Sequence, residues 1–219
     1  MSVDIRVSEE PARACAELLA EAAVRGAHVA LSGGGTVGKA HEAAALLQPD
    51  WTGVHVWWGD DRAVPPDHEH SNYRLARETL LDRVARPPEV HRIRGELGAE
   101  EAARVLDAEL EGVVLDLAVN GIGPDGHTAS LFPDAAGLGE RVRRAVAAEA
   151  GLEPFVPRVT MTPPVFAAAR LLVYLVAGEA KAEAVRATFA GEPSPETPAS
   201  LVRGRETVAL LDPAAASLL

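Results

Sequence analysis

The sequence predicts an α/β fold in which a mostly parallel sheet carries helices on both faces. Short apolar runs of β-type residues alternate with Ala-rich stretches of helical spacing, and most of these apolar runs are continuous. Continuous runs are typical of strands that are buried on both faces, and the alternation of strands with helices predicts that the strands are parallel. We therefore expect an open, Rossmann-like sheet. The 219 residues show no repeat and no disordered linker, so a single domain spanning residues 1–219 is expected.

The expected strands and helices follow one another along the chain. Strands are predicted at 28–33 (HVALSG), 54–60 (VHVWWGD), 115–123 (LDLAVNGIG), 171–178 (LLVYLVAG) and 207–212 (TVALLD). Helices are predicted at 9–25, 38–47, 71–85, 99–112 and 179–190. The proline-rich pieces at 65–72 and 191–198 are predicted to be loops and not domain boundaries.

Three of these strands end in polar loops that contain glycine. The loops read SGGGT, GDDR and NGIGPDGHT. In an open parallel sheet, ligands bind outside the carboxyl ends of the strands. We therefore expect the three loops to meet on one rim of the sheet and to form a site there.

Composition excludes several classes of partner. The net charge is -11, with 32 acidic against 21 basic side chains. A surface of this kind repels nucleic acid and anionic membranes, so neither is expected as a partner. A small anionic ligand remains compatible with this charge if the basic contacts are concentrated locally.

Cysteine and hydropathy patterns predict a soluble, cytoplasmic protein. Cys15 is the one cysteine, so no internal disulfide can form, and no Cys/His spacing typical of a zinc site occurs. No apolar run approaches the roughly 20 residues that span a bilayer. The first residues, MSVDIRVSEEPARAC, lack the apolar core of a signal peptide.

The glycine loop at Gly33, Gly34 and Gly35 is a candidate anion site. Consecutive glycines between a buried strand and a helix leave backbone N–H groups uncovered at the positive end of the helix dipole. A tight turn that binds no ligand is the alternative interpretation.

Residues 31–40 (LSGGGTVGKA) also fit two nucleotide-binding patterns. They match G-x-G-x-x-G, and they match the P-loop pattern except at its last position, where Ala40 lacks the hydroxyl that holds magnesium. Asp60 lies about where a ribose-binding acid belongs in a dinucleotide fold. However, the chain leaves little room for a separate catalytic domain, and no Tyr-x-x-x-Lys pair is present. Dinucleotide binding is therefore disfavoured.

The second loop, GDDRAVPPDHEHSNY (59–73), concentrates charge at a strand end. Arg62 is suited to bind a phosphate or a carboxylate, because its planar guanidinium can donate two parallel hydrogen bonds. His68 and His70 are interpreted as surface histidines, since the local sequence supplies no third ligand for a metal. A solvated surface loop is the alternative for the whole segment.

The third loop, NGIGPDGHTASLFPD (120–134), carries the most specific pattern. Its glycines bend the backbone around Pro124 and leave Asp125 and His127 at the tip. A histidine two residues from a carboxylate, at the end of a strand, suits general-base catalysis with an orienting acid. A structural loop in which His127 caps a following helix is the alternative.

Two further basic residues are candidate anchors for an anion. Lys181 follows VAGEA at the start of a predicted helix, so its ammonium group can reach the rim. Arg158 precedes VTMTPPVF. Each of them could equally be an ordinary surface charge.

Taken together and in order, these stretches resemble the 6-phosphogluconolactonase family, which belongs to a larger group that also holds glucosamine-6-phosphate deaminases. LSGGGT resembles the family's phosphate loop, SGGST, and WWGDDRAVPPDHEHSNY is similar to its W-x-GDER-x-V…SN segment. GIGPDGHTASLFPD resembles its most specific run, and RVTMTPPVFAAARLLVYLVAGEAKA its C-terminal half. The sequence departs from the pattern at Gly35 (usually Ser), Val37 (commonly Pro) and Asp61 (Glu).

The resemblance implies hydrolysis of 6-phospho-D-glucono-1,5-lactone to 6-phosphogluconate in the oxidative pentose phosphate pathway. His127 would be the general base, with either Asp125 or Asp60 holding its tautomer, and Arg62 would face either the oxyanion or the phosphate. The groups expected to bind the substrate are Gly33, Gly34, Gly35, Thr36, Arg158 and Lys181 for the phosphate, and Asn72 for the sugar hydroxyls. No metal or organic cofactor is expected, and the chain would act as a monomer or small homo-oligomer.

Two other functions on the same fold remain as alternatives. In the deaminase branch the corresponding loop continues into a Phe-Asn-Glu-Pro run whose Glu assists ring opening. Here Phe132 stands in the place of that Glu, and an apolar ring cannot move protons. A non-catalytic sugar-phosphate sensor would keep the phosphate loop but would have no need of His127.

Overall fold

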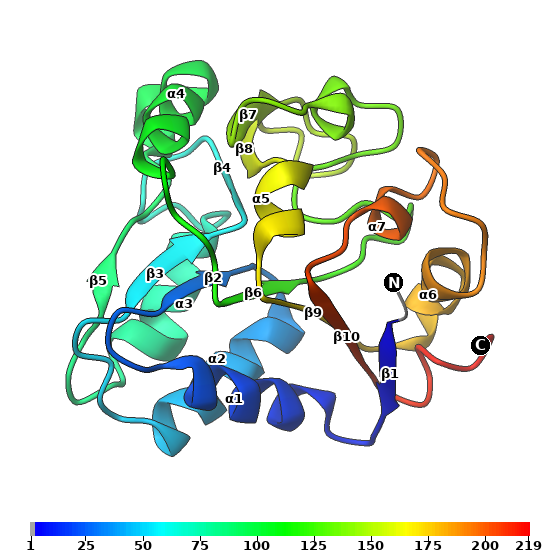
Figure 1. Ribbon diagram of the computed structural model, residues 1–219, viewed down its shortest axis with the longest axis horizontal. Helices are drawn as coiled ribbons and strands as arrows, with labels where there is room; N and C mark the ends of the chain where they lie inside the picture. The colour runs from blue at the N-terminus through cyan, green and yellow to red at the C-terminus, as the bar shows by residue number, and fades with distance from the viewer. Residues whose placement is uncertain (1–2) are drawn as a thin grey trace.

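Seven parallel strands form the central sheet of the computed structural model, which describes residues 3–219. The strand order is β1-β10-β9-β6-β2-β3-β5, and every neighbouring pair is parallel (Figure 1). The strands are β1 (Asp4–Val7), β2 (His28–Leu31), β3 (His55–Trp58), β5 (Glu89–Val90), β6 (Leu117–Asn120), β9 (Leu171–Val176) and β10 (Glu206–Leu211). The predicted α/β fold with a mostly parallel sheet is thus confirmed.

A second, antiparallel sheet of three strands lies beside the first. Its order is β4 (Asp60–Arg62), β8 (Arg158–Met161) and β7 (Ala145–Ala148). The prediction that GDDR is a loop was therefore wrong. Three charged residues do not show the apolar pattern of a strand, and it is pairing with β8 that makes this segment extended. The register places Arg62 directly opposite Arg158.

Helices cover both faces of the central sheet. On one side lie α1 (Pro11–Ala22), α2 (Gly35–Leu47) and α3 (Asn72–Ala76), and on the other lie α4 (Ala99–Glu109), α5 (Pro163–Ala168) and the second sheet (Figure 1). Near the C-terminal end of the chain, α6 (Ala182–Phe189) and α7 (Pro198–Leu201) complete the fold.

Several boundaries differ from the prediction. Helix α2 begins at Gly35 and not at residue 38, because Gly34 is its N-cap and the first turn already starts inside the glycine loop. The helix predicted at 71–85 consists of α3 followed by a π-helical turn at Arg77–Leu81, and the one predicted at 179–190 starts with a 3-10 turn at Glu179–Lys181. Strand β1 was not predicted, because DIRV is an exposed edge strand without an apolar run.

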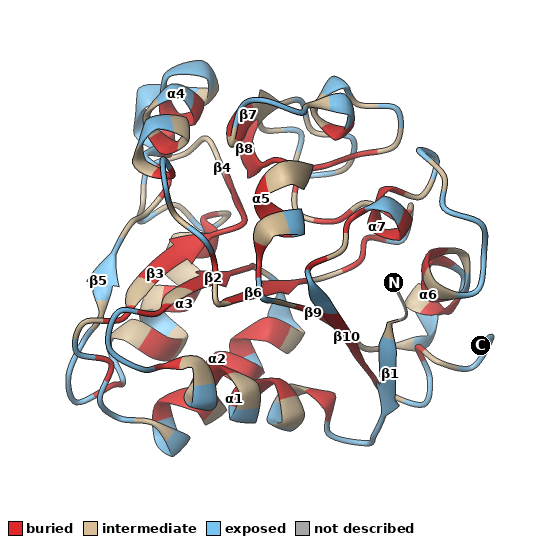
Figure 2. Ribbon diagram, in the orientation of Figure 1, coloured by how far each residue is buried: buried red, intermediate tan, exposed pale blue. Residues whose placement is uncertain are grey.

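Burial follows the apolar pattern that predicted the elements. Five of the six residues of β9 are buried, as expected for a strand covered on both faces (Figure 2). In α1 the buried residues Cys15, Ala16 and Leu19 recur at helical spacing on one face. The largest fully buried side chains include Trp51, Trp57, Trp58, Tyr174 and Phe166.

The order of connections fixes where a ligand can bind. The chain runs from β2 to β3 on one side of β2, and it later enters the sheet again at β6 on the other side. The loops that follow β2 and β6 therefore diverge and leave a crevice at the carboxyl ends of these strands. The glycine loop and the loop that carries His127 flank this crevice.

No helix within residues 3–219 is both long enough and apolar enough to cross a membrane.

Candidate active site

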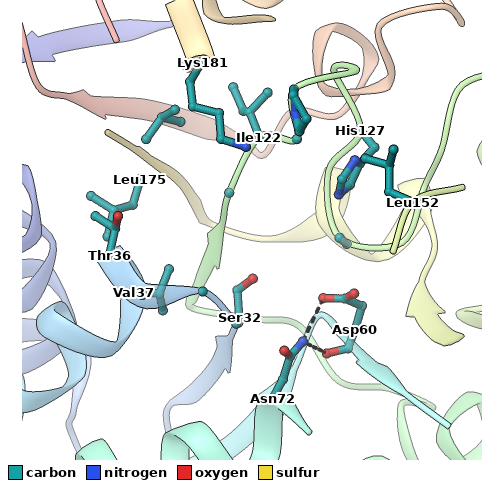
Figure 3. A pocket seen from close by; sticks show the side chains of 18 of the residues that line it. Ser32, Thr36, Val37, Asp60, Asn72, Ile122, His127, Leu152, Leu175 and Lys181 are labelled. Carbon is teal, nitrogen blue, oxygen red and sulfur yellow. Dashed lines mark hydrogen bonds between the residues drawn. The ribbon is translucent and has the colours of Figure 1, made fainter. Parts of the chain in front are cut away.

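A pocket of about 500 Å³ lies at the carboxyl ends of the central strands. It is lined by ten of the predicted site residues: Gly33, Gly34, Gly35, Thr36, Asp60, Arg62, Asn72, His127, Arg158 and Lys181. Figure 3 shows the side chains of Lys181, His127 and Asp60 around the same open space, with Ser32 and Thr36 along another side. Asp125 does not line the pocket, but its carboxylate contacts Nδ1 of His127. The structure thus brings together loops that are far apart in the sequence.

The glycine loop turns the start of α2 toward the pocket. Gly34 has φ +103°, a conformation that residues with a side chain rarely adopt. The first bond of the helix runs from Gly38 N to Gly34 O, so the N–H groups of the preceding turn have no helical acceptor. At Gly33, a Cβ atom would lie only 1.9 Å from Asn72 Oδ1. Glycine at this position therefore admits the Asn72 side chain next to the loop.

Asn72 links Asp60 to Arg62 below the glycine loop. Its amide Nδ2 donates to the main-chain oxygen of Asp60 at 2.9 Å and lies 3.4 Å from Asp60 Oδ1 (Figure 3), and its Oδ1 accepts from Arg62 Nη1. Ser130 Oγ donates to Asp60 Oδ2 at 2.5 Å. Asp60 is thus held by Ser130 and Asn72 and makes no hydrogen bond to His127. Asn72 uses both ends of its amide group inside the protein.

Asp61 fixes the start of α3 and hence the position of Asn72. Its buried carboxylate accepts from the main-chain N–H of Arg62 and Asn72, both at 2.7 Å, and of Tyr73 at 3.0 Å. Burial raises the pKa of Asp61 to about 6, although these N–H donors oppose the rise. We interpret Asp61 as a structural acid.

His127 and Asp125 form a hydrogen-bonded pair at the edge of the pocket. His127 Nδ1 lies 2.5 Å from Asp125 Oδ1. Because an ionised carboxylate only accepts, Nδ1 carries the proton of the neutral imidazole, which leaves the lone pair on Nε2. Burial alone would raise the pKa of Asp125, but the hydrogen bond from His127, together with the positive charge of the ring when it is protonated, lowers it overall. At Gly123, a Cβ atom would lie 2.0 Å from His127 Nδ1, so glycine is needed there to make room for the pair.

Arg62 and Arg158 place two like charges side by side in the pocket wall. They face each other across β4 and β8, and the Nε atom of each is buried without a hydrogen-bond partner in the described part of the chain. The pKa of Arg158 is lowered by burial and by the charge of Arg62, while Asp60 and Asp61 partly offset this. An anion bound between the two guanidinium groups would relieve their repulsion.

Lys181 completes the positive charge of the pocket. Its side chain extends from the start of the α6 segment into the open space (Figure 3). Burial lowers the pKa of its ammonium group, and the charge of Asp125 opposes this. Lys181 is therefore close enough to the His127–Asp125 pair to be influenced by it.

Sequence reasoning missed several residues that build the site. Ser130 holds Asp60, and it lies within the quoted run GPDGHTASLFP, where its hydroxyl was a signal that could have been used. Phe132 packs against His127, with their ring centroids 4.6 Å apart. Leu152 and Glu153 line the pocket from a segment that carries no motif. Leu175 comes from the end of β9, where its apolar side chain predicted only a core position.

The fold and this pocket together describe an α/β protein whose candidate site is lined by groups suited to bind a small anion. A comparison with known protein families identifies the family of this chain. The chain belongs to the family described as glucosamine-6-phosphate isomerases/6-phosphogluconolactonase, whose model matches residues 5–210. The resemblance found in the sequence is thus confirmed.

Individual relatives agree with this assignment. The chain is 37% identical to the 6-phosphogluconolactonase of Synechocystis sp. over 199 residues, which cover 84% of this chain and 81% of the relative. The crystal structure of 6-phosphogluconolactonase from Leishmania guyanensis is similar with a TM-score of 0.84 and 26% identity, covering 98% of both chains. A monomeric glucosamine-6-phosphate deaminase has a TM-score of 0.88 at 20% identity and covers 100% of both chains. At this identity, the similarity to the deaminase shows only that the fold is shared. The fold therefore does not distinguish the lactonase branch of the family from the deaminase branch.

Proposed function

We propose that this protein hydrolyses 6-phospho-D-glucono-1,5-lactone to 6-phosphogluconate in the oxidative pentose phosphate pathway. The observation that carries the proposal is the His127–Asp125 pair, in which His127 Nε2 has no hydrogen-bond partner within residues 3–219 and lies beside a pocket rich in anion-binding groups. Relatives named 6-phosphogluconolactonase that cover most of the chain support it. We further propose that the protein acts as a single domain, as a monomer or small homo-oligomer, and meets this sugar phosphate in the cytoplasm.

His127 is the general base of the proposed reaction. Nε2 removes a proton from a water molecule while the water oxygen forms a bond to the lactone carbonyl carbon, and the carbonyl π electrons move to the oxygen. Asp125 holds Nδ1–H and stabilises the imidazolium ion that results. Asp60 is assigned a positioning role through Asn72 and Ser130, since its hydrogen bonds go to these residues and not to His127.

Ring opening completes the reaction. The tetrahedral intermediate collapses, the bond from the former carbonyl carbon to the ring oxygen breaks, and the ring oxygen takes the proton that His127 carries. The products are a free hydroxyl group and a carboxylic acid that ionises at neutral pH. Because a lactone is already an activated ester, these steps need no cofactor for electron or group transfer.

We assign the phosphate to the glycine loop and the arginine pair. Gly33 lies against Asn72, whose Oδ1 accepts from Arg62, and Arg62 faces Arg158. These contacts run continuously from the uncovered N–H groups at the start of α2 to two guanidinium groups, which is the combination that a dianionic phosphate prefers. Lys181 adds a third positive charge, and Thr36 a hydroxyl group. Arg62 is therefore assigned to the phosphate and not to the oxyanion.

Deamination is not favoured. Phe132 lies against His127 at the position where deaminases carry a proton-transferring Glu, and its aromatic ring cannot take that role. A sensor without activity is disfavoured as well, because it would not need a histidine held by a carboxylate.

Two assays run in parallel test the proposal. Release of 6-phosphogluconate is followed with the spontaneous hydrolysis subtracted, and ammonia release from glucosamine 6-phosphate is followed under the same conditions. We expect acceleration of the first reaction alone. Acceleration of the second reaction alone would overturn the proposal.

A further inference from the structure

Four polar residues gather at the amino ends of the central strands, opposite the pocket. His28, His55 and Glu89 are the first residues of β2, β3 and β5. The register pairs His28 with His55 and His55 with Glu89, and in-register residues of parallel strands point to the same face. His91 follows Glu89 by two residues and shares that face. The strand register thus brings His28 and His55 to the Glu89–His91 segment, although these three parts of the chain are far apart in the sequence.

Three of these residues hold their ligand atoms close together. His55 Nδ1 lies 3.0 Å from His91 Nε2 and 3.4 Å from Glu89 Oε2. One ligand atom from each of the three lies within 4.8 Å of the others, and within residues 3–219 this is the one group of three His, Cys, Asp or Glu side chains with that property. Ligands of a tetrahedral zinc ion, bound at about 2.0–2.2 Å, lie roughly 3.3–3.5 Å apart. The two separations that involve His55 Nδ1 are close to this spacing.

Neighbouring rings hold the histidines in place. Trp57 stacks on His91 with a centroid distance of 4.0 Å, and His28 stacks on His55 at 4.6 Å. Trp57 Nε1 donates to His28 Nδ1 at 3.0 Å, so that nitrogen of His28 is already used and His28 supports the site without being a ligand. Rings fixed in this way lose little freedom when a metal binds, and such supporting contacts orient metal ligands in general.

We propose that His55, Glu89 and His91 bind one divalent late-transition-metal ion of the zinc type, with water at the remaining position. Two imidazoles and a carboxylate form a known zinc ligand set that leaves one position open. The ion joins β3 to β5, a strand of two residues at the edge of the sheet, and so stabilises that edge. The site lies at the end of the sheet opposite His127, and it takes no part in lactone hydrolysis.

Zinc binding is measured on the full chain, purified without a polyhistidine tag and treated with EDTA. Equilibrium dialysis against ZnCl₂ is expected to give about one Zn²⁺ per chain, and Zn²⁺ is expected to raise the Tm because it binds the folded state. His91→Gln and Glu89→Gln are each expected to weaken binding by at least about tenfold. Because the Glu89 side chain is 63% exposed, Glu89→Gln does not threaten folding. His68→Gln removes a histidine outside the cluster and is expected to bind Zn²⁺ like the wild type.

Three outcomes would overturn the proposal: absence of bound zinc in the wild type, unchanged zinc binding in both cluster variants, or loss of binding in His127→Ala with retention in His91→Gln. The last result would place the ion in the pocket. The Tm of each variant in EDTA establishes that it is folded. An anomalous difference peak between His55, Glu89 and His91 in a crystal soaked with ZnCl₂ would locate the ion directly.

Discussion

The two ends of the central sheet carry different chemistry on the same strands. At the carboxyl ends, β2, β3 and β6 lead into the glycine loop, the Asp60–Arg62 strand and the His127 loop, which line a pocket. At the amino ends, His28, His55 and Glu89 begin β2, β3 and β5 and pack against one another. The first end is hollow and positively charged, whereas the second is closed by stacked rings.

The two ends differ because loops build the carboxyl end and strand residues build the amino end. The carboxyl end is built from loops whose glycines leave backbone N–H groups and space for a substrate. The amino end is built from strand residues whose side chains are aligned by register, so it can bring ligand atoms together. Substitutions at the two ends should therefore affect different properties.

The largest expected effect is that of His127→Ala on catalysis. Loss of a general base lowers kcat by about 10²–10⁴-fold, while binding of 6-phosphogluconate changes little because the phosphate contacts remain. Steady-state kinetics and titration calorimetry measure the two effects. His91→Gln, at the other end of the sheet, serves as the control with unchanged kcat. Equal losses of kcat in His127→Ala and His91→Gln would show that the two ends of the sheet do not have separate roles.

Gly123→Ala is expected to displace the side chain of His127 while leaving that residue in the chain. Its Cβ would lie 2.0 Å from His127 Nδ1, so the ring must move, and displacement of a catalytic group by about 1 Å costs roughly 10²-fold in rate. Gly121→Ala is the matched control, because a Cβ there meets no atom within 4 Å. If kcat of Gly123→Ala matched that of Gly121→Ala, the position of His127 would not matter for the rate.

Arg158→Gln is expected to weaken substrate binding selectively. Hydrogen bonds to a charged group contribute about 1.5–3 kcal/mol, so KM for the phosphorylated lactone should rise by about 10–100-fold. KM for unphosphorylated gluconolactone should change much less, and comparison of the two substrates is the measurement. Arg170→Gln removes an exposed arginine that lies just before β9, and it controls for the loss of a positive charge. A similar rise with both lactones would contradict the assignment of Arg158 to the phosphate.

The smallest expected effect is a pH dependence that comes from Lys181. Burial lowers the pKa of its ammonium group, so the positive charge is lost as pH rises, and this begins below the pH at which an ordinary lysine titrates. The phosphate is already dianionic above about pH 7. The Kd of 6-phosphogluconate should therefore rise several-fold toward alkaline pH in the wild type. In Lys181→Arg the side chain stays charged at alkaline pH. If the Kd of 6-phosphogluconate rose by the same factor in this variant, a group other than Lys181 would cause the pH dependence.

Much of the carboxyl end was predictable, because its residues lie in continuous motifs. Arg62, His127 and the glycine loop each follow a strand whose apolar run is plain in the sequence. The choice between Asp125 and Asp60 as the partner of His127 was not predictable, since it depends on where β4 runs, and β4 exists only through its pairing with β8. The predicted start of α2 at residue 38 is too late, because glycine has a low helix propensity and does not indicate a first turn in the sequence.

The amino end gave no signal in the sequence. His55 comes from β3, Glu89 from β5 and His91 from the residue that follows β5, so no spacing typical of a metal site is visible. Only the register of β3 and β5 brings them together. Burial of a continuous apolar run is a property of local sequence, whereas register between distant strands is a property of the whole fold.

A crystal structure with bound 6-phosphogluconate would locate both ends of the ligand in the pocket. We expect the phosphate to lie against the start of α2 and between Arg62 and Arg158. We also expect an oxygen of the new carboxylate about 3 Å from His127 Nε2, the reach of a general base. A product bound in the reverse direction, with its phosphate beside His127, or bound outside this pocket would show that these assignments are wrong.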